Sequence, residues 1–546
     1  MYKVLVTDGI SDSGLKSLYD HPNFLIDRQP TLPLDELAKI IGEYDALIVR
    51  SQTKVTEELL KYADRLQVIA RAGVGVDNID VNAATKKGII VINAPGANTI
   101  AATEHTLAMM LALARKIPQA YQVTVSGKWD RNSFKGVELY KKTLGVLGMG
   151  KIGTEVAKRA KAFGMTILGF DPYLSEDRAE KLGVTKATVE MIARESDFIT
   201  IHTPLTNETR SLINEEFLQK TKKGVRFVNC ARGGIIDEKA LLAAIQSGHV
   251  AGAALDVFAK EPVADPELLD NPNIIVTPHL GASTVEAQEK VAQEVSAEII
   301  EIFESHSIRN AVNMPQMSGE TQQKMKPYLL LCEQAGLLAM QLLKKAPAKI
   351  DINYYGDLIE EDTDLLTRTM IKGILSYHLS DSVNLINSLH LLKEQGVTYN
   401  VQHNASNKGF ANYLELTVSQ GDQTATIGAT VLNGYGARIV KINEYRIDVR
   451  PEKYLLYIKH HDIPGMIGKV GSLLGNYTIN IGTMQVGRAN VGGEAIMVLT
   501  LDKAIGTEIV ADLTLIEGIA EAQLLELENV DSVYPGQLEP EKVESV

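Results

Sequence analysis

The stretch TLGVLGMGKIGTEVAKRAKAFGMTILGFD at 143–171 constrains the fold most, because a strand, a glycine turn, a helix and a second strand follow at fixed spacing. The turn Gly148-x-Gly150-x-x-Gly153 supplies a tight bend, bare backbone on which a pyrophosphate can lie, and a close helix-to-strand contact. The helix that follows points unpaired N–H groups and its positive dipole end at that phosphate. The pattern therefore predicts a nucleotide-binding βαβ unit; the alternative is an ordinary glycine-rich turn.

Asp171 ends the second strand of this unit, roughly 20 residues beyond the glycines. A carboxylate at this place can accept hydrogen bonds from both ribose hydroxyls and would repel a 2′-phosphate. The sequence therefore favours NAD over NADP as cofactor.

The 546-residue chain is too long for one core and predicts about three or four domains. Its net charge of -13 gives no electrostatic footprint for nucleic acid or an anionic membrane, so we expect neither as a partner. An anionic substrate must then be bound by a local cationic pocket.

Two cysteines, Cys230 and Cys332, cannot form a disulfide framework or a thiolate metal site, and the N-terminus lacks a signal-peptide core. We expect a cytoplasmic protein without a metal.

Residues 3–95 alternate short apolar runs with helical patterns, which is typical of a parallel sheet wrapped by helices in a flavodoxin-like layer. A helix after residue 284 is expected to return to that layer. Beyond residue 313 helical patterns are followed by alternating strands, and beyond Pro451 the order is β-α-β-β-α-β. We predict an α/β fold with two Rossmann/flavodoxin-like domains, a substrate-binding one at 1–98 with 284–312 and a nucleotide-binding one at 99–283. An α+β intervening domain is expected at 314–450 and a βαββαβ module at 452–528, followed by a flexible tail at 536–546.

Three loops beyond the glycine turn carry groups suited to hydride transfer to a 2-keto acid. Arg232, in NCARGGIID, offers a forked, permanently charged donor to a carboxylate. His279, in TPHLGAST, can give and take the alcohol proton, and Glu261, in KEP, can accept its other ring N–H. Taken singly, the alternatives are a surface salt bridge, a structural histidine and an exposed turn glutamate.

Other candidates lie nearby. Asp256, which closes the strand AALDVF, is a candidate for contact with the nicotinamide carboxamide or a strand-end cap, and Cys230 is expected to be a small wall residue. In the first domain a glycine-rich loop with a neighbouring arginine can hold a carboxylate through backbone N–H groups. The substrate-binding candidates are Arg50 with Ser51, Arg71, Gly73, Gly75 and, farther along, Arg131, each arginine having a surface charge as its alternative.

Together the motifs RSQTKV, ARAGVGVDNID, GKW, LGVLGMGKIG, FITIHTPLT, VNCARGGIIDE, GAALDVF, AKEP and PHLGAST resemble the D-isomer-specific 2-hydroxyacid dehydrogenases. Over the whole chain the resemblance is to the long-form D-3-phosphoglycerate dehydrogenases, with an intervening domain and a C-terminal ACT domain. It implies NAD-dependent oxidation of 3-phospho-D-glycerate to 3-phosphooxypyruvate, the first committed step of L-serine synthesis. It also implies that Arg232 orients the substrate, that His279 is the general acid and base, and that Glu261 is its partner.

The resemblance further implies a set of cofactor contacts. Position 74 is Val where some relatives place a hydroxyl, so only its backbone is expected to take part. Besides the three glycines of the turn, the set comprises Val74, Lys151, Ile152, Asp171, Thr203, Cys230, Ala231, Arg232, Asp256, His279, Leu280, Gly281 and Ala282.

In the C-terminal module, the resemblance implies that relatives which bind serine use polar groups where this chain has His460, Asp462 and Asn480, and L-serine as an effector is a hypothesis. A homo-oligomer, dimer or tetramer, is expected because modules of this type expose a sheet edge. Two other functions stay open: a dehydrogenase of another D-2-hydroxy acid such as 2-hydroxyglutarate, and a non-catalytic NAD-sensing regulator. The regulator hypothesis predicts loss of the acid–base set, which is present here.

Overall fold

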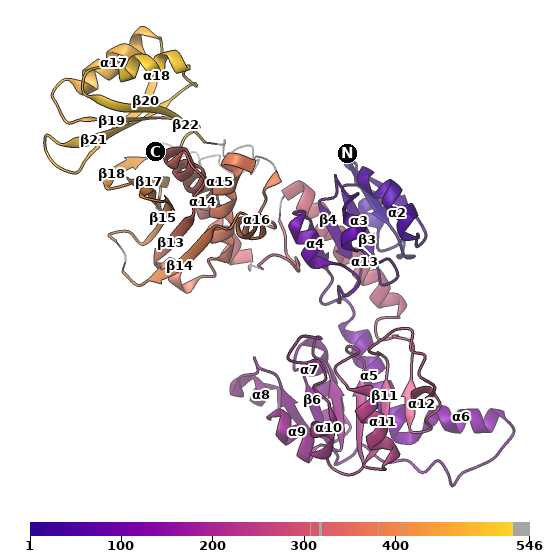
Figure 1. The fold of residues 1–546 in the computed structure, drawn as a ribbon. Helices are drawn as coiled ribbons and strands as arrows, with labels where there is room; N and C mark the ends of the chain where they lie inside the picture. The colour runs from indigo at the N-terminus through magenta and orange to yellow at the C-terminus, as the bar shows by residue number, and fades with distance from the viewer. Residues whose placement is uncertain (306, 316–318, 380–381, 407, 528–546) are drawn as a thin grey trace, which may run out of the picture.

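The structure is a computed structural model that describes residues 1–305, 307–315, 319–379, 382–406 and 408–527. Four sheets follow one another along the chain (Figure 1). Their order confirms the predicted class: two parallel-sheet domains, then a mixed and an antiparallel sheet. The tail expected at 536–546 lies outside the described residues.

The first sheet is parallel and has the order β2-β1-β3-β4-β5, which is the flavodoxin-like order. Its strands are short apolar runs because both faces are covered by helices. The strands are β1 (Tyr2–Val6), β2 (Phe24–Arg28), β3 (Ala46–Val49), β4 (Val68–Arg71) and β5 (Ile90–Asn93), and the helices between them are α1 (Lys16–Tyr19), α2 (Leu34–Ile40), the 3₁₀ turn η1 (Ile41–Glu43), α3 (Glu57–Leu60) and α4 (Val81–Lys86).

The second sheet is parallel with the order β12-β11-β10-β9-β6-β7-β8, so the direction of winding reverses between β6 and β9. Ligands of open α/β sheets bind at such a switch point, beyond the carboxyl ends of the strands. The strands are β6 (Thr143–Leu147), β7 (Thr166–Phe170), β8 (Thr185–Lys186), β9 (Phe198–Ile201), β10 (Val225–Asn229), β11 (Val250–Leu255) and β12 (Ile274–Val276).

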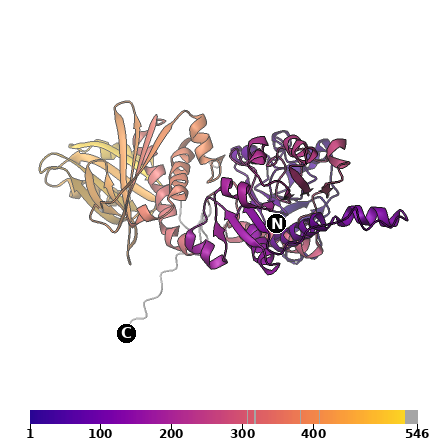
Figure 2. The same cartoon turned by 90° about the horizontal axis from the view of Figure 1, so that it is seen from below.

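Helices cover both faces of this sheet. The glycine turn leads into α7 (Lys151–Ala162), which packs against the long helix α5 (Thr99–Arg115). Helix α6 (Ile117–Val125) has no buried residue and projects away from the sheets in both views (Figures 1 and 2). The remaining helices are α8 (Glu176–Leu182), α9 (Val189–Glu195), α10 (Glu215–Gln219), α11 (Glu238–Gln246) and α12 (Pro266–Leu269).

Helix α13 (Val285–Ser305) carries the chain back to the first sheet, where it contacts α1 and β4. Its buried side chains Val291, Val295 and Ile299 join the core of that sheet. For this reason we propose that residues 284–312 belong with residues 1–98 in one discontinuous domain.

The segment that follows α13 pairs with the outer strand β5. Ala311 forms an antiparallel bridge with Ile92, and the Val312 N–H donates to the Val91 carbonyl at 2.7 Å. The Asn313 side chain accepts the Val91 N–H at 3.0 Å and donates to the Ile89 carbonyl at 2.9 Å. The exit to the C-terminal half is therefore fixed to the first sheet.

The third sheet has the order β14-β13-β15-β16-β17-β18, with only the β13–β14 pair parallel. The helices expected here are present, but β13 lies between two of them and β14 follows the third, so the segment is not simply helices and then strands. The elements are α14 (Gly319–Leu343), β13 (Lys349–Gly356), the 3₁₀ turn η2 (Asp357–Glu360), α15 (Asp364–Leu379), α16 (Ser388–Glu394), β14 (Thr398–Asn404), β15 (Asn412–Gln420), β16 (Gln423–Leu432), β17 (Gly436–Ile442) and β18 (Tyr445–Val449).

The fourth sheet is antiparallel, with the order β20-β21-β19-β22 and the predicted βαββαβ sequence of elements. One face is covered by its two helices, and the other shares a core with α14 and the third sheet. The Gln341 side chain of α14 bonds both backbone groups of Glu526, at 2.9 and 2.7 Å. The elements are β19 (Tyr454–His461), α17 (Met466–Asn476), β20 (Ile481–Arg488), β21 (Glu494–Leu501), α18 (Thr507–Thr514) and β22 (Ile519–Glu526).

Candidate active site

A cavity of about 600 Å³ lies between the first two sheets. Its walls come from loops at the carboxyl ends of β1, β3 and β4 on one side and of β9, β10 and β12 on the other. Because parallel strands deliver their following loops to one edge, segments far apart in the sequence meet here. Fifteen of the predicted site residues line it: Arg50, Ser51, Arg71, Gly73, Val74, Gly75, Ile152, Thr203, Cys230, Ala231, Arg232, Glu261, His279, Gly281 and Ala282.

An imidazole–carboxylate pair stands at one wall of this cavity. His279 Nδ1 lies 2.9 Å from Glu261 Oε2, and Glu261 Oε1 accepts the Phe258 N–H at 3.1 Å. The carboxylate is thus held by backbone on one side and by the ring on the other. With Nδ1 facing Glu261, Nε2 is the ring nitrogen that can exchange a proton with a ligand.

Arg232 extends across the cavity toward the first domain. Its Nε lies 3.2 Å from Asp77 Oδ2, and its Nη1 donates to the Ala231 carbonyl at 2.6 Å. Gly75 makes room for the guanidinium, because a Cβ there would lie 2.1 Å from Arg232 Nη2. The absence of a side chain at position 75 therefore permits the close approach of the two domains at this arginine.

Arg71 is a partly buried cation on the same side of the cavity. Burial, and then the nearby charge of Arg232, lower the pKa of Arg71 to about 10. Its Nε is buried and makes no hydrogen bond within the described residues. A buried donor without a partner is costly, so this group favours a ligand that offers a hydrogen-bond acceptor, as an anion does. Arg50, Arg71 and Arg232 all line the cavity and together form the cationic pocket expected from the acidic composition.

The loop that carries Arg50 is held by two residues that sequence reasoning missed. Asp8 accepts the N–H groups of Arg50 and Thr53, both at 2.9 Å. Asn78 donates to the Arg50 carbonyl at 2.7 Å. Burial raises the pKa of Asp8, but its hydrogen bonds from Thr53, Thr31 and Arg50 outweigh that effect and hold it below the ordinary value. The signal available was a polar residue directly after the first strand, in KVLVTD.

The glycine turn has the geometry that a dinucleotide requires. Gly148 has φ +97°, and a Cβ there would lie 2.6 Å from the His202 carbonyl oxygen. A Cβ on Gly153 would lie 1.9 Å from the Gly148 oxygen, so the helix and strand touch at this point, whereas Gly150 faces open space. Helix α7 begins next to it, at Lys151. The turn and Lys151 are not among the residues lining the 600 Å³ cavity, but Ile152 is.

Asp171 is anchored beside this turn. Its two carboxylate oxygens accept the N–H groups of Met149 and Tyr173, both at 2.9 Å. The arrangement fixes a negative charge at the end of β7, where the ribose of a dinucleotide is expected.

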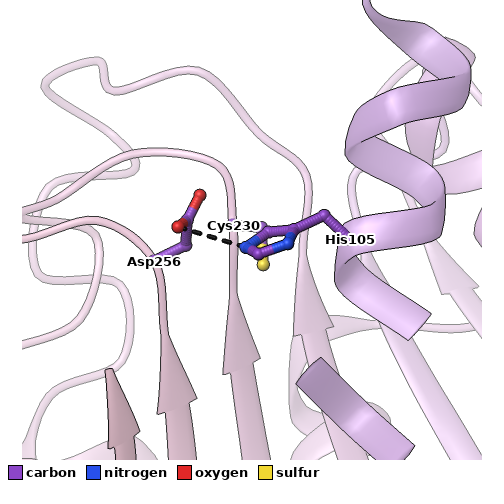
Figure 3. Close-up of side chains that lie close together, drawn as sticks. All are labelled: His105, Cys230 and Asp256. Carbon is purple, nitrogen blue, oxygen red and sulfur yellow. Dashed lines mark ion pairs between the residues drawn. The ribbon is translucent and has the colours of Figure 1, made fainter. Parts of the chain in front are cut away.

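Asp256 does not line the cavity. It is fully buried, and its oxygens accept hydrogen bonds from Thr277 Oγ1, Leu280 N and Gly281 N. Figure 3 shows the His105 ring directed at this carboxylate, with the Cys230 sulfur beside the ring. These contacts are those of a strand-end cap. Leu280 also lies outside the lining residues.

The same three side chains, His105, Cys230 and Asp256, place potential metal-ligand atoms within 4.8 Å of one another. Burial, and then the charge of Asp256, raise the pKa of the Cys230 thiol to about 12. Cys230 is therefore a neutral thiol at ordinary pH, which agrees with its predicted role as a wall residue.

His202 also lines the cavity and was not predicted. Burial lowers the pKa of its imidazole to about 3, and its Nε2 lies 3.0 Å from Thr200 Oγ1. It stays neutral across the working range of an enzyme and does not compete with His279 as acid or base.

Arg131 does not reach the cavity. It is exposed in the loop after α6, on the part of the chain that projects from the domain. The residues between α6 and the glycine turn contain no pattern that would have predicted that this loop extends away from the domain.

The predicted effector residues lie in the fourth sheet and its turns. His460 is buried, with Nδ1 2.8 Å from the His461 oxygen, and its Nε2 has no partner within the described residues. Asp462 accepts from Gly492 N at 3.2 Å and pairs with Arg488 at 3.3 Å, while Asn480 donates to Asp502 at 2.6 Å. No hydrogen bond joins the three to one another in the part of the chain that is described.

Two family matches cover much of the chain. Residues 107–281 match the D-isomer specific 2-hydroxyacid dehydrogenase NAD-binding domain, and residues 324–443 match the D-3-phosphoglycerate dehydrogenase intervening domain. Within the described residues, each helix is too short or too polar to cross a membrane.

Relatives match over nearly the whole length. The chain is 46% identical to D-3-phosphoglycerate dehydrogenase of Bacillus subtilis (strain 168) over 528 residues, covering 96% of this chain and 100% of that protein. It is 43% identical to the enzyme of that name from Methanocaldococcus jannaschii, with the same two coverages. Among solved structures, the TT0316 protein from Thermus thermophilus matches with a TM-score of 0.53 and 34% identity, covering 57% of this chain and 99% of that one.

Proposed function

The chain belongs to the D-3-phosphoglycerate dehydrogenases, within the D-isomer-specific 2-hydroxyacid dehydrogenase family, and from this premise we propose how its cavity performs the reaction. The activity is NAD-dependent oxidation of 3-phospho-D-glycerate to 3-phosphooxypyruvate, the first step of L-serine biosynthesis. The observation that carries the proposal is the convergence of the His279–Glu261 pair and three arginines on one cavity.

Bound NAD⁺ would supply the acceptor for the hydride that leaves C2 of the substrate. His279 acts as general base, taking the C2 hydroxyl proton at Nε2 as the carbonyl forms. Glu261 accepts a hydrogen bond from Nδ1–H, keeps the ring in the productive tautomer and stabilises the imidazolium that forms when Nε2 takes the proton. In the reverse direction the imidazolium returns the proton to the carbonyl oxygen.

Different arginines bind the two anionic groups of the substrate, its carboxylate and its phosphate. We assign Arg232 to the carboxylate and the reacting oxygen, because its fork is fixed by Asp77 and Ala231 and shares the cavity wall with His279. Arg71 and Arg50, with Ser51 and the backbone at Gly73 and Gly75, receive the phosphate on the first-domain side, while the Val74 backbone is kept for the cofactor. Arg131 lies outside this cavity and is given no contact with the substrate there.

The glycine turn, with Gly148, Gly150, Lys151, Ile152 and Gly153, is assigned to the pyrophosphate, and Asp171 to the adenosine ribose. A cofactor with a 2′-phosphate would bring two negative charges together at Asp171. We therefore assign NAD as the preferred cofactor. Thr203, Cys230, Ala231, Gly281 and Ala282 line the cavity and complete the proposed cofactor wall.

Purified protein mixed with NAD and 3-phosphoglycerate at alkaline pH, with phosphooxypyruvate trapped, should produce NADH absorbance. The alternative function, oxidation of an unphosphorylated D-2-hydroxy acid such as 2-hydroxyglutarate, is separated by comparing kcat/KM values. Arg71→Met should lower kcat/KM for the phosphorylated substrate most, and Arg194→Met, at an exposed side chain of α9, is the matched control. Equal kcat/KM for both substrate classes would reject the phosphate assignment; NADH binding without turnover of any D-2-hydroxy acid would favour the regulator.

We also propose that the protein is a cytoplasmic homo-oligomer. Helix α6 and the loop after it expose Ile117, Tyr121, Val125 and Trp129, and an exposed apolar stripe of this kind is typical of an interface. Tyr121→Asp combined with Trp129→Asp should shift the mass measured by sedimentation toward the monomer, whereas Tyr173→Asp, a change of an exposed tyrosine elsewhere, should not. A monomeric wild-type protein would reject the interface.

L-serine is proposed as an effector at the C-terminal module, through His460, Asp462 and Asn480. The buried, unpartnered Nε2 of His460 supports the proposal, because such an atom gains from a polar ligand. Titration with L-serine should lower the activity, and Asn480→Ala should weaken that response without changing the uninhibited rate. Unchanged activity at millimolar serine would reject it.

A further inference from the structure

One buried carboxylate holds the backbone of the loop that carries Arg50. Asp8 follows β1 and is only 7% exposed, and its Oδ2 accepts the N–H groups of Arg50 and Thr53, both at 2.9 Å. The hydroxyls of Thr53 and Thr31 donate to its Oδ1 at 2.5 and 2.8 Å. Hydrogen bonds to an ionised acceptor are among the strongest in proteins. The path of the loop 50–53 is therefore fixed by Asp8.

Asn78 holds the same loop through its carbonyl groups. The two hydrogens of its side-chain amide allow two donated bonds, and Nδ2 lies 2.7 Å from the carbonyl oxygens of both Arg50 and Thr53. Arg50 is thus bound at its N–H by Asp8 and at its C=O by Asn78. A guanidinium stands at the end of a long side chain, so its place in the cavity depends on a backbone that is fixed in this way.

Asn78 also joins this loop to the glycine-rich loop that follows β4. Val55 and Ile79 form a parallel bridge, in which the Val55 N–H donates to the Asn78 carbonyl at 2.8 Å. Asn78 comes directly after Asp77, the residue that pairs with Arg232. The two loops of the first domain that face the substrate therefore form one hydrogen-bonded unit.

Neither Asp8 nor Asn78 lines the cavity, whereas Arg50 and Ser51 do. We infer that Asp8 and Asn78 are positioning residues that select a phosphorylated substrate without touching it, because they fix Arg50 at the phosphate end of the cavity. The inference deepens the proposed function and rests on it for the role of Arg50.

The charge of Asp8 would by itself have the opposite effect on substrate binding. Burial lowers the pKa of Arg71, and the negative charge of Asp8 acts against that shift, so the carboxylate is felt at the arginines. A negative charge there weakens the attraction of the pocket for an anion. Removing the charge alone should therefore lower KM for 3-phosphoglycerate, whereas losing the position of Arg50 should raise it. The sign of the change in KM separates the two effects.

The kinetic test uses Asp8→Asn, which keeps the shape but offers one acceptor oxygen in place of two. We expect KM for 3-phosphoglycerate to rise about 10- to 100-fold, the cost of a displaced binding group, with kcat changed less than about twofold. The affinity for D-glycerate, which lacks the phosphate, should change less than about twofold when it is measured as substrate or inhibitor. Asp35→Asn, on the exposed first turn of α2, is the matched control. A lower KM, or an equal loss of affinity for both compounds, would overturn the inference.

Two further changes keep the test decisive if Asp8→Asn does not fold. Asn78→Leu removes both donated bonds without changing the charge, and it should raise KM for 3-phosphoglycerate with the same selectivity over D-glycerate. Thr53→Val removes one hydroxyl bond and should raise KM about threefold, while Thr53→Ser, which keeps the hydroxyl, should restore the wild-type value. Equal KM values in the two Thr53 variants would overturn the inference.

A double-variant comparison asks whether Asp8 acts through Arg50. Asp8→Asn added to Arg50→Met should raise KM for 3-phosphoglycerate little more than Arg50→Met alone, because residues that act as a unit are not additive. Effects on KM that multiply would show that Asp8 acts elsewhere and would overturn the inference.

A measurement that does not depend on turnover keeps the inference separate from the proposed function. Hydrogen exchange of the peptide that contains residues 50–53 should be at least about tenfold faster in Asp8→Asn than in the wild type, and unchanged in Asp35→Asn. Unchanged exchange in Asp8→Asn would overturn the inference even in an active enzyme. Failure of the wild type to oxidise 3-phosphoglycerate, with the exchange result as expected, would reject the proposed function alone.

Discussion

His279 Nδ1 and Glu261 Oε2 lie 2.9 Å apart, and the other oxygen of Glu261 is tied to the backbone N–H of Phe258. The two residues are 18 positions apart in the sequence, on loops that follow different strands of the same parallel sheet. The carboxylate is thus restrained before the ring meets it, so the pair is preorganised for proton transfer.

Replacing His279 should lower kcat more than replacing Glu261. His279→Ala removes the base and should lower kcat by about 10²- to 10⁴-fold, while Glu261→Gln, which keeps an acceptor but removes the charge, should cost about 10- to 100-fold. Steady-state kinetics with 3-phosphoglycerate check this, with Glu267→Gln on the exposed first turn of α12 as control. Full activity of Glu261→Gln would contradict the assigned partnership.

Arg71 predicts a pH dependence of substrate affinity. Its pKa is lowered to about 10, first by burial and then by Arg232, so the cation is lost as the pH rises through that value. KM for 3-phosphoglycerate should therefore rise above about pH 10 in the wild type. In Arg71→Met, KM should be high at every pH and this step should vanish. A step of the same size in the variant would assign the titration to another group.

The same lowered pKa predicts an effect on stability. The folded protein holds the Arg71 cation less well than the unfolded chain does, so its charge destabilises the fold below about pH 10 and this cost lessens as the pH rises above that value. Without ligand, Arg71→Met should raise the free energy of unfolding at pH 7 by up to about 3 kcal/mol. Denaturant titrations check it, and a destabilised variant would show that the arginine's packing outweighs its charge.

Cofactor choice should depend on Asp171. Asp171→Ser removes the charge that opposes a 2′-phosphate, and Arg178, which donates to the Met149 carbonyl at 3.2 Å, stands beside the turn as a cation for that phosphate. The ratio of kcat/KM for NAD to that for NADP should fall by about 10- to 100-fold, the value of a hydrogen-bonded charge. Asp177→Ser on exposed α8 is the control, and an unchanged ratio would place the ribose elsewhere.

The thiols should react slowly despite the position of Cys230 at the cavity. Burial raises the pKa of Cys230 to about 12, and Cys332 is fully buried with its pKa raised by the same cause. At pH 8 the native protein should resist alkylation by iodoacetamide, whereas denatured protein should take two labels. Intact-mass spectrometry distinguishes these outcomes; rapid labelling of Cys230 would mean that its loop opens in solution.

The strand-and-turn pattern was enough to predict both parallel sheets and the loops that bring Arg232, Glu261 and His279 together. Their residue types and their places after strand ends are local properties of the sequence. The roles of Asp8 and Asn78 were not predicted, because each depends on hydrogen bonds to a loop that only the folded sheet brings near. Their positions in the sequence alone resemble ordinary turn residues.

The structure differs from the sequence prediction at β13 and at Arg131, and each difference has a physical reason. Strand β13 alternates buried and partly exposed residues, but it lies between two strongly helical stretches. The sequence therefore predicts helices there and does not reveal this strand. Arg131 is close in sequence to elements of the nucleotide domain, but α6 buries none of its residues on that domain and carries the loop outward. In both cases the tertiary partner, which the local pattern does not contain, decides the placement.

The pairing of Ala311 with Ile92 has a consequence for shortened forms of the protein. β5 is the outer strand of its sheet, and this pairing with the Asn313 hydrogen bonds covers part of its free backbone edge. Proteolysis before residue 310 would uncover that edge, and bare strand edges recruit other chains into aggregates. A catalytic fragment trimmed after Asn313 would keep its own cover and stay in solution.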